Sequence, residues 1–242
     1  MVNAYLIDVG NTNIKIYNYN DAIIDKLILK HEDFDEEKFL NFFKESKLVI
    51  YASVKPSIDE KIKNLFKSYN FFIIDNKIKT NLKMSKENRA VIGADLLAAA
   101  SYAYHYFKKE LLLISLGSAN ALIHVDNEAN LKHCLIWPGL FTSAKSLFAN
   151  ELLYDIELNN ADSILADNTS SGINKGIIYA FDGALKHIIE CYQKELGCAI
   201  IVCACGGNLK FLNQARKLID YTDNDLIMKG MLYLYELNHP RI

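Results

Sequence analysis

Apolar and polar residues alternate over the first thirty positions of the chain in three short runs with turn residues between them. The runs Val2–Asp8, Ile14–Tyr19 and Ala22–Leu29 have a period of two, which predicts three strands in an antiparallel meander. Further predicted strands are Leu48–Ser53, Phe71–Ile74, Leu111–Leu116, Leu131–Trp137 and Ala199–Ala204, and predicted helices are Glu36–Lys44, Ser57–Lys67, Ala94–Phe107 and a helix starting near Leu209. The polar segment Asp75–Arg89 is expected to be irregular.

The strand and turn at the start of the chain occur a second time, 107 residues further on. The segment Leu6–Ile16 matches Leu113–Ile123 at a leucine, an isoleucine, a glycine, an asparagine and the final isoleucine. Because strands and helices follow both copies, the sequence predicts an α/β protein of two duplicated halves, residues 1–108 and 109–242. Each half would begin with a hairpin, and the two hairpins would face each other across a cleft.

Composition narrows the class of ligand. The chain has 242 residues, of which 51% are hydrophobic and 23% charged, so it can bury a substantial core. Its formal net charge of -2 gives no basic footprint, and we expect a small soluble ligand rather than nucleic acid. No apolar run reaches the roughly 18 residues of a membrane span, so a cytoplasmic protein is expected. The five cysteines and six histidines lack ligand spacing, which argues against a metal held by protein alone.

The first turn, Asp8-Val9-Gly10-Asn11-Thr12-Asn13, has residues suited to phosphate binding. A glycine at position 10 permits positive φ and close approach of a ligand, so turn N–H groups can point at phosphate oxygens. Thr12 and the following Lys15 add a hydroxyl and a cation, and the Asp8 carboxylate is placed to bind Mg²⁺. The alternative is an ordinary tight hairpin turn that begins with an aspartate.

Two further segments carry candidate chemistry. Asp95 lies in the first turn of the alanine-rich helix, where the helix dipole favours a carboxylate. The pair Gly206-Gly207 follows an apolar strand, and such a pair lets a flat ring lie against the backbone. Each also has a plain interpretation, as a helix-start residue and as an ordinary turn.

Six short blocks, in order and at similar spacings, resemble type III pantothenate kinase and cover nearly the whole chain. They are Asp8-Val9-Gly10-Asn11-Thr12-Asn13, Gly93-Ala94-Asp95, Gly117-Ser118-Ala119, Pro138-Gly139-Leu140, Asn168-Thr169 with Gly176, and Gly206-Gly207. The resemblance implies two ribonuclease-H-like halves of the actin-like and sugar-kinase-like ATPase superfamily. It also implies the first step of coenzyme A synthesis, in which ATP phosphorylates the terminal hydroxyl of pantothenate.

The resemblance assigns roles residue by residue. Asp95 would be the proton acceptor, and Asp8 would help to hold Mg²⁺. ATP phosphates and adenosine would be bound by Asp8, Val9, Gly10, Asn11, Thr12, Asn13, Ile14, Lys15, Ser118, Gly206 and Gly207. Pantothenate would be bound by Gly93, Ala94, Asp95, Leu96 and Thr169.

Three positions depart from the family pattern. Leu96 stands where the family has an arginine, so one cation near the phosphates or the pantothenate carboxylate is missing. Ser115 replaces an aspartate that binds a monovalent cation such as K⁺ or NH₄⁺ in the family, and a serine oxygen brings no charge. Lys86 stands at the spacing of a substrate-side tyrosine, where it could replace the missing charge.

A long helix is predicted from Asn168 to about Glu195 and is stopped by Gly197. One face of it has only small residues, Gly172, Gly176, Ala180 and Gly183. Each glycine inside a helix costs roughly 1 kcal/mol relative to alanine, so close helix packing should compensate for them. Packing within the chain and packing in a dimer remain alternatives, and the family resemblance favours a homodimer whose partner chain helps to complete the pantothenate site.

Three functions are therefore weighed. The first is an active pantothenate kinase, supported by Asp8 and Asp95. The second is a catalytically impaired relative that acts as an accessory or regulatory binding protein, which the changes at Ser115, Leu96 and Lys86 would allow. The third is a different small-molecule kinase of the same fold.

Overall fold

The computed structural model describes residues 2–45, 47–148 and 156–240, and these form two compact units. Unit 1 comprises Met1–Tyr106 with Asp225–Ile242, and unit 2 comprises Phe107–Asn224. The first boundary lies within two residues of the one expected at 108. The last segment differs from the expectation, because residues 225–242 return to unit 1 instead of remaining with the second half.

Unit 1 is built on a five-stranded mixed sheet in the order β3-β2-β1-β4-β5. Its strands are β1 (Asn3–Val9), β2 (Asn13–Asn20), β3 (Ile23–Lys30), β4 (Leu48–Ser53) and β5 (Phe71–Ile74). The first three pair antiparallel, which confirms the meander, and β1, β4 and β5 run parallel. Parallel strands need crossover connections, and α2 (Pro56–Leu65) supplies the one between β4 and β5.

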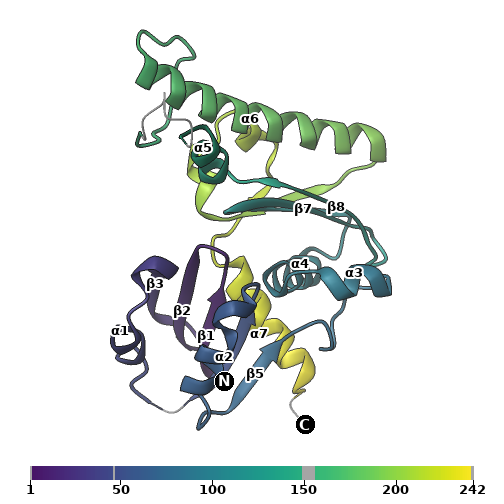
Figure 1. The fold of residues 1–242 in the computed structure, drawn as a ribbon. Coiled ribbons are helices and arrows are strands. Elements are labelled where there is room, and N and C mark those ends of the chain that lie inside the picture. Colours follow the sequence, from purple (N-terminus) through teal and green to yellow (C-terminus); the bar gives the residue numbers. More distant parts are fainter. Residues whose placement is uncertain (1, 46, 149–155, 241–242) are drawn as a thin grey trace. The chain divides into compact units, whose positions relative to one another are not determined.

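Helices cover both faces of this sheet. Tyr5, Ile7 and Val9 point to one face, where they pack against Phe39 of α1 (Glu36–Leu40) and against α2. Alternate residues of a strand point to opposite faces, so Ala4 and Leu6 pack against α4 (Ala94–Phe107) and α7 (Leu226–Asn238) on the other face. The same alternation directs Asp8 to the α4 face. Figure 1 shows α7, from the end of the chain, running beside the first strands.

Unit 2 repeats the arrangement with a sheet in the order β10-β9-β6-β7-β8. Its strands are β6 (Leu111–Leu116), β7 (Ala119–Val125), β8 (Leu131–Pro138), β9 (Ile201–Cys205) and β10 (Tyr221–Thr222). Each strand of unit 1 has a counterpart five numbers later in the same sheet position, with the same direction of pairing. The duplicated α/β halves predicted from the sequence are therefore present.

One face of the second sheet is covered by α5 (Leu140–Phe148) and by α6 (Thr169–Leu196), the longest helix in Figure 1. The Asn168 side chain caps α6 by accepting from the Ser171 N–H, and Gly197 ends it at φ 61°. Ile178, Phe181 and Leu185 supply its buried stripe. This helix follows the sequence prediction closely.

Three predicted elements differ. The irregular segment predicted at Asp75–Arg89 ends in a helix, α3 (Lys86–Val91), because the Ser85 hydroxyl accepts a hydrogen bond from the Asn88 N–H. The helix expected near Leu209 is a short 3-10 turn, η2 (Gly207–Phe211), followed by a second one, η3 (Ala215–Leu218). The helix predicted to reach Lys44 ends as α1 at Leu40, and a 3-10 turn, η1 (His31–Asp33), precedes it.

Candidate active site

Asp8 and Lys15 face each other across the first hairpin. They are paired residues of β1 and β2, and Lys15 Nζ lies 3.9 Å from Asp8 Oδ2. The Asp8 side chain is almost fully buried, whereas that of Lys15 keeps 31% of its surface exposed. The pair therefore places a buried carboxylate and a partly solvated ammonium group at the end of the first two strands.

Burial is the main influence on the Asp8 carboxyl and raises its pKa from 3.8 to about 7. The negative charge of Asp95 raises the pKa further, and the Lys15 ammonium lowers it. Asp95 is thus close enough to act on Asp8 electrostatically. The structure brings Asp8, Lys15 and Asp95 together within unit 1, although the sequence separates Asp95 from the hairpin by 80 residues.

Asp95 is the second residue of α4. Its Oδ1 accepts a hydrogen bond from the Leu96 N–H at 2.8 Å, and burial raises the pKa of its carboxyl despite this bond and despite Lys15. A Cβ at Gly93 would stand 2.6 Å from Oδ1 and 3.1 Å from Val54 Cγ1. The absence of a side chain at position 93 therefore lets the carboxylate fold back over the start of the helix.

The turn itself closes through a hydrogen bond from the Gly10 N–H to the Asn13 carbonyl at 3.0 Å. Gly10 does not adopt positive φ, so this part of the expectation is wrong, and the close approach of a ligand stays a prediction. Asn11 and Thr12 are exposed at the tip. The side chains of Val9 and Ile14 are fully buried in the core, which leaves only their main chains for any ligand.

The second hairpin has a turn one residue shorter than the first. Strand pairing ends at Val9 with Ile14 in the first hairpin and at Leu116 with Asn120 in the second. The 107-residue spacing therefore holds along β6 and changes to 106 along β7, so the prediction of a constant spacing is wrong. Asn120 therefore matches Asn13 in the sequence alignment but occupies a different position in its hairpin. Ser115 keeps the place of Asp8, paired with Ala121 and beside Cys205 of β9.

At Gly206 the backbone conformation itself requires a glycine. It has φ 112°, and a Cβ there would overlap the Leu116 carbonyl group. The next residues hold the second hairpin, since Asn208 Nδ2 donates to the Gly117 carbonyl at 2.9 Å. Ser118, Gly206 and Gly207, all expected to contact nucleotide, thus lie at the same end of the second sheet.

The remaining predicted residues lie in separate places. Lys86 is the exposed first residue of α3, and Leu96 is half-buried directly after Asp95. Thr169, at the first position of α6, is exposed and belongs to unit 2. Within unit 1, Lys86 is not part of the cluster formed by Asp8, Lys15 and Asp95.

A hollow of about 470 Å³ lies in unit 1 beside the start of α4. Gly93 and Ala94, both predicted to contact substrate, form part of its wall. The lining also includes Asp59, which accepts hydrogen bonds from Tyr51 and Ser53 at 2.7 and 2.6 Å. The volume of the hollow lies within the roughly 300–1,000 Å³ of small-molecule sites.

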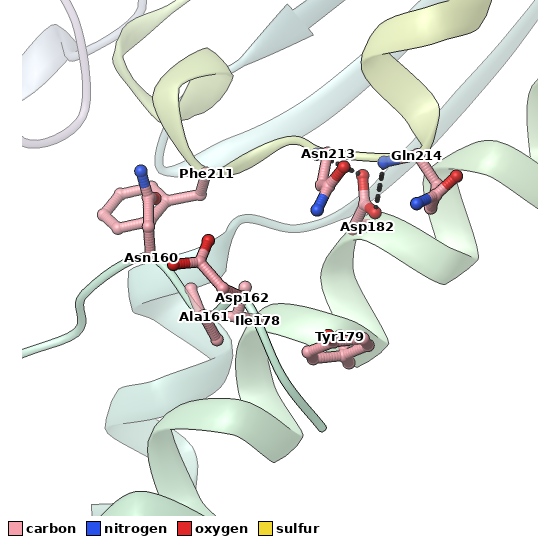
Figure 2. Close-up of a pocket in the computed structure, with 9 residues that line it drawn as sticks. All are labelled: Asn160, Ala161, Asp162, Ile178, Tyr179, Asp182, Phe211, Asn213 and Gln214. Carbon is pink, nitrogen blue, oxygen red and sulfur yellow. Dashed lines mark hydrogen bonds between the residues drawn. The ribbon is translucent and has the colours of Figure 1, made fainter. Parts of the chain in front are cut away.

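A second cavity, of about 110 Å³, lies between α6 and the loops that Figure 2 shows. The buried Asp182 carboxylate on its wall accepts from the backbone N–H groups of Asn213, Gln214 and Ala215 at 2.8–3.0 Å. Both carboxylate oxygens are therefore used to fix the loop that leads into η3. The volume is too small for a nucleotide, and we interpret this cavity as structural.

No group of three or more histidine, cysteine, aspartate or glutamate side chains in the described residues could hold a metal ion. A Mg²⁺ site needs fewer protein ligands, because the ion commonly binds one or two carboxylates together with substrate phosphates and water. Asp8 fits such a site, since a cation beside its buried carboxylate would offset the burial and the charge of Asp95.

Comparison with known proteins decides the family. The model of the type III pantothenate kinase family matches residues 5–191, more than three quarters of the chain. The chain belongs to the type III pantothenate kinase family. A curated type III pantothenate kinase of Bifidobacterium longum subsp. infantis is 28% identical over 249 residues, which cover 96% of this chain and 98% of that one.

Solved structures with little sequence identity share the fold of this pantothenate kinase. A protein from Sinorhizobium meliloti assigned as a 2-dehydro-3-deoxygalactonokinase has a TM-score of 0.66 at 8% identity, covering 99% of this chain and 98% of its own. MreB 5 of Spiroplasma citri, solved with AMPPNP, has a TM-score of 0.54 at 11% identity, covering 98% and 97%. The chain therefore has the same fold as these two proteins.

The family settles the activity that the sequence suggested. The protein is a kinase that uses ATP to phosphorylate pantothenate in coenzyme A biosynthesis, and it binds both compounds. Among the described residues, none of the helices combines the length and apolar character that a membrane crossing requires.

Sequence reasoning missed two contacts of this pantothenate kinase at its first hairpin. His31 Nε2 lies 2.8 Å from the Gly10 carbonyl oxygen, and Lys55 Nζ lies 3.4 Å from the Asn11 carbonyl oxygen. No spacing rule points to either contact, although His31 lies two residues after the predicted strand Ala22–Leu29.

Proposed function

We propose that Asp95 accepts the proton of the pantothenate hydroxyl while the first hairpin holds the ATP phosphates. The observation that carries this proposal is the cluster at the end of β1, where Asp8, Lys15 and Asp95 act on one another electrostatically. The buried Asp8 carboxylate lies next to the partly exposed Lys15 and the turn that follows Val9. This combination of groups suits phosphoryl transfer.

The reaction requires an alcohol oxygen to attack the γ-phosphorus of ATP. The new P–O bond forms as the bond to the oxygen that leaves with ADP breaks, and the hydroxyl proton passes to Asp95. The transition state is usually loose, so Asp95 would contribute mainly by orienting the hydroxyl. Its raised pKa makes the carboxylate a better proton acceptor than an ordinary aspartate.

Asp8 would bind Mg²⁺ directly or through water. The ion, when bound, neutralises charge on the phosphoryl group being transferred. At the matching place in the second hairpin, Ser115 would offer a monovalent cation, K⁺ or NH₄⁺, one uncharged oxygen. We therefore propose that the monovalent cation contributes little to this enzyme.

Substrate contacts are assigned by position. Val9, Gly10, Asn11, Thr12, Asn13 and Ile14 would contact phosphates, together with Ser118, and Gly206 and Gly207 would border adenosine. Pantothenate would lie along Gly93, Ala94 and Leu96, with part of it in the 470 Å³ hollow. Lys86, exposed at the start of α3, would be available to the pantothenate carboxylate.

The enzyme would act as a homodimer joined through α6. Gly176, Ala180 and Gly183 are exposed on the described chain, and an added Cβ at Gly176 or Gly183 would meet no atom within 4 Å. A partner helix could approach this face closely, and the exposed Thr169 on the same helix would then contact pantothenate near the interface. Because ATP and the later steps of coenzyme A synthesis are cytoplasmic, we place the enzyme in the cytoplasm.

The substitution Asp95→Asn tests the assignment of the base. It should lower kcat by about 10² to 10⁴, because the amide cannot accept the proton, and leave ATP affinity within a few-fold of the original. The assay incubates enzyme with ATP, Mg²⁺ and pantothenate and measures ADP and phosphopantothenate. Asp33→Asn, the same change on the exposed turn after β3, serves as the control.

Different outcomes of this assay separate the alternatives. A fully active Asp95→Asn enzyme would refute the role of Asp95. Binding of ATP without turnover in the unmodified protein would favour an accessory binding protein, and ADP formed only with another alcohol would favour a different kinase.

A further inference from the structure

The carbonyl oxygens of the first turn all accept hydrogen bonds from within the protein. The Gly10 N–H donates to Asn13, and Lys55 Nζ donates to the Asn11 carbonyl. The other two carbonyls are held by one residue, since the His31 N–H donates to the Thr12 carbonyl at 3.1 Å and its ring Nε2 lies 2.8 Å from the Gly10 carbonyl oxygen.

Holding the carbonyls also sets the direction of the N–H groups. In a planar trans peptide the N–H points opposite to the carbonyl. Fixing the Gly10 carbonyl toward His31 therefore turns the Asn11 N–H, which belongs to the same peptide, away from His31. Successive N–H groups at a turn can form an anion-binding concavity.

The second hairpin is held in the same way by different residues. The Gly139 N–H donates to the Ser118 carbonyl at 2.9 Å, as the His31 N–H does to Thr12, because both residues directly follow the third strand of their sheet. A side chain at position 139 would overlap the Gly117 carbonyl. The Gly117 carbonyl is instead held by Asn208, which occupies the place after β9 that Lys55 has after β4.

The contact fixes what the His31 Nε2 atom does. A carbonyl oxygen can only accept, so Nε2 carries a hydrogen and donates it to the Gly10 carbonyl. Nδ1 is buried and has no partner among the described residues, a state that costs free energy. A half-buried ring whose one buried nitrogen is unsatisfied is retained most simply because of what its other nitrogen does.

We propose that His31 is a positioning residue that keeps the first turn in its phosphate-binding conformation through the Gly10 carbonyl. The proposal rests on the assignment of this hairpin to the ATP phosphates. His31 does not contact the nucleotide itself. Without the ring, the Gly10 to Asn11 peptide can rotate, and its N–H no longer has a fixed direction.

Binding of ligands with and without a phosphate chain tests the proposal. His31→Leu should weaken binding of the non-hydrolysable analogue AMPPNP with Mg²⁺ by about tenfold, the equivalent of one lost hydrogen bond, and leave adenosine affinity unchanged. The KM for pantothenate should also remain unchanged. His133→Leu, on an exposed position of β8 in the other sheet, is the matched control.

A conservative pair of variants covers the case in which the leucine variant fails to fold. Gln at position 31 carries an amide nitrogen near the place of Nε2, whereas Asn reaches only the place of Nδ1. AMPPNP should therefore bind His31→Gln within about threefold of the original affinity and bind His31→Asn as weakly as the leucine variant.

Equal loss of adenosine and AMPPNP affinity, or glutamine no better than asparagine, would overturn the proposal, as would unchanged AMPPNP binding in a folded leucine variant. Because the AMPPNP and adenosine titrations contain no pantothenate, they stand apart from the test of the proposed base. If Asp95→Asn retains full activity but His31→Leu loses only phosphate-dependent affinity, the assignment of the base fails and that of His31 survives.

Discussion

Oδ1 of Asp95 lies over Gly93, at 2.6 Å from the point where a Cβ on that residue would be. The Asp95 carboxylate and the bare backbone of Gly93 therefore occupy one small space at the start of α4. Any side chain at position 93 has to displace the Asp95 carboxylate, because this side chain can move more easily than the backbone at residue 93.

Gly93→Ala should lower kcat by about tenfold to a hundredfold, because even a displacement of about 1 Å is costly for a positioned group. ATP affinity should change little, since Gly93 is separate from the hairpin. Steady-state kinetics with pantothenate checks the first point and AMPPNP titration the second. An unfolding temperature within a few degrees of the original would show that the loss is local, and an unchanged kcat would mean that Asp95 is not held by this contact.

Asp8→Asn should stabilise the free enzyme at neutral and alkaline pH. Asp8 is protonated up to a pKa of about 7 in the folded state but ionises near 3.8 when unfolded. The folded state thus binds more protons between these values, so this group lowers the free energy of unfolding as the pH rises from about 4 to 7, and the loss is complete above 7. The amide removes that loss, which amounts to a few kcal/mol at most.

Urea unfolding at pH 4 and pH 8, without Mg²⁺ and nucleotide, measures the effect. The variant should exceed the original protein in stability at pH 8 and match it at pH 4. In the presence of Mg²⁺ and ATP the original should gain stability and the variant should gain much less, because the ligand no longer meets a carboxylate. A variant that is less stable at pH 8 would contradict the raised pKa.

Leu96→Arg should lower the KM for pantothenate by about threefold to tenfold, a change typical of a partly exposed ion pair. Leu96 is half-buried beside Asp95, so a longer side chain can extend past the base. Leu96→Met, similar in length but uncharged, controls for shape. If both variants change the KM equally, the missing arginine charge is not what limits affinity.

Exchange of K⁺ for a large organic cation should alter the activity by less than about twofold, because an uncharged oxygen binds a monovalent ion weakly. Ser115→Asp should make the enzyme respond to K⁺, and Ser115→Asn, the same size without charge, should not. Activity measured over a K⁺ titration distinguishes them. A strong K⁺ response in the unmodified enzyme would show that other groups supply the site.

Gly176→Arg should convert a dimer to a monomer. The protomer has room for the side chain, since nothing lies within 4 Å of an added Cβ, whereas two closely packed helices would not. Sedimentation at micromolar concentration reports the change. Glu195→Arg, in the last turn of the same helix, introduces the same side chain as a control. A monomer before any substitution would remove the proposed interface.

Much of the fold could be predicted because the local pattern of apolar residues agreed with the packing of each strand or helix against its neighbours. The alternation along β1 and β2 predicted the hairpin, which then placed Lys15 opposite Asp8. The meeting of Asp8 with Asp95 was suggested by the family resemblance but not by spacing, since it depends on α4 packing on the face of β1 that carries Asp8.

Other features were not predicted from the sequence. The polar residues of α3 show no apolar period, and the N-terminal cap of this helix, Ser85, is recognised only in the structure. The shorter second turn was concealed by a chance match between Asn13 and Asn120. The role of His31 depends on a contact between its ring and a carbonyl 21 residues earlier, which no spacing rule predicts.

The place of α7 also has a consequence for the order of events during synthesis. Met228, Met231 and Leu234 complete the core on one face of the first sheet, yet in the sequence they follow the whole of unit 2. The sheet of unit 1 therefore lacks one of its covering helices until the chain has continued past Phe107–Asn224. The half that carries the proposed base would thus complete its core only after the whole of unit 2 has been made.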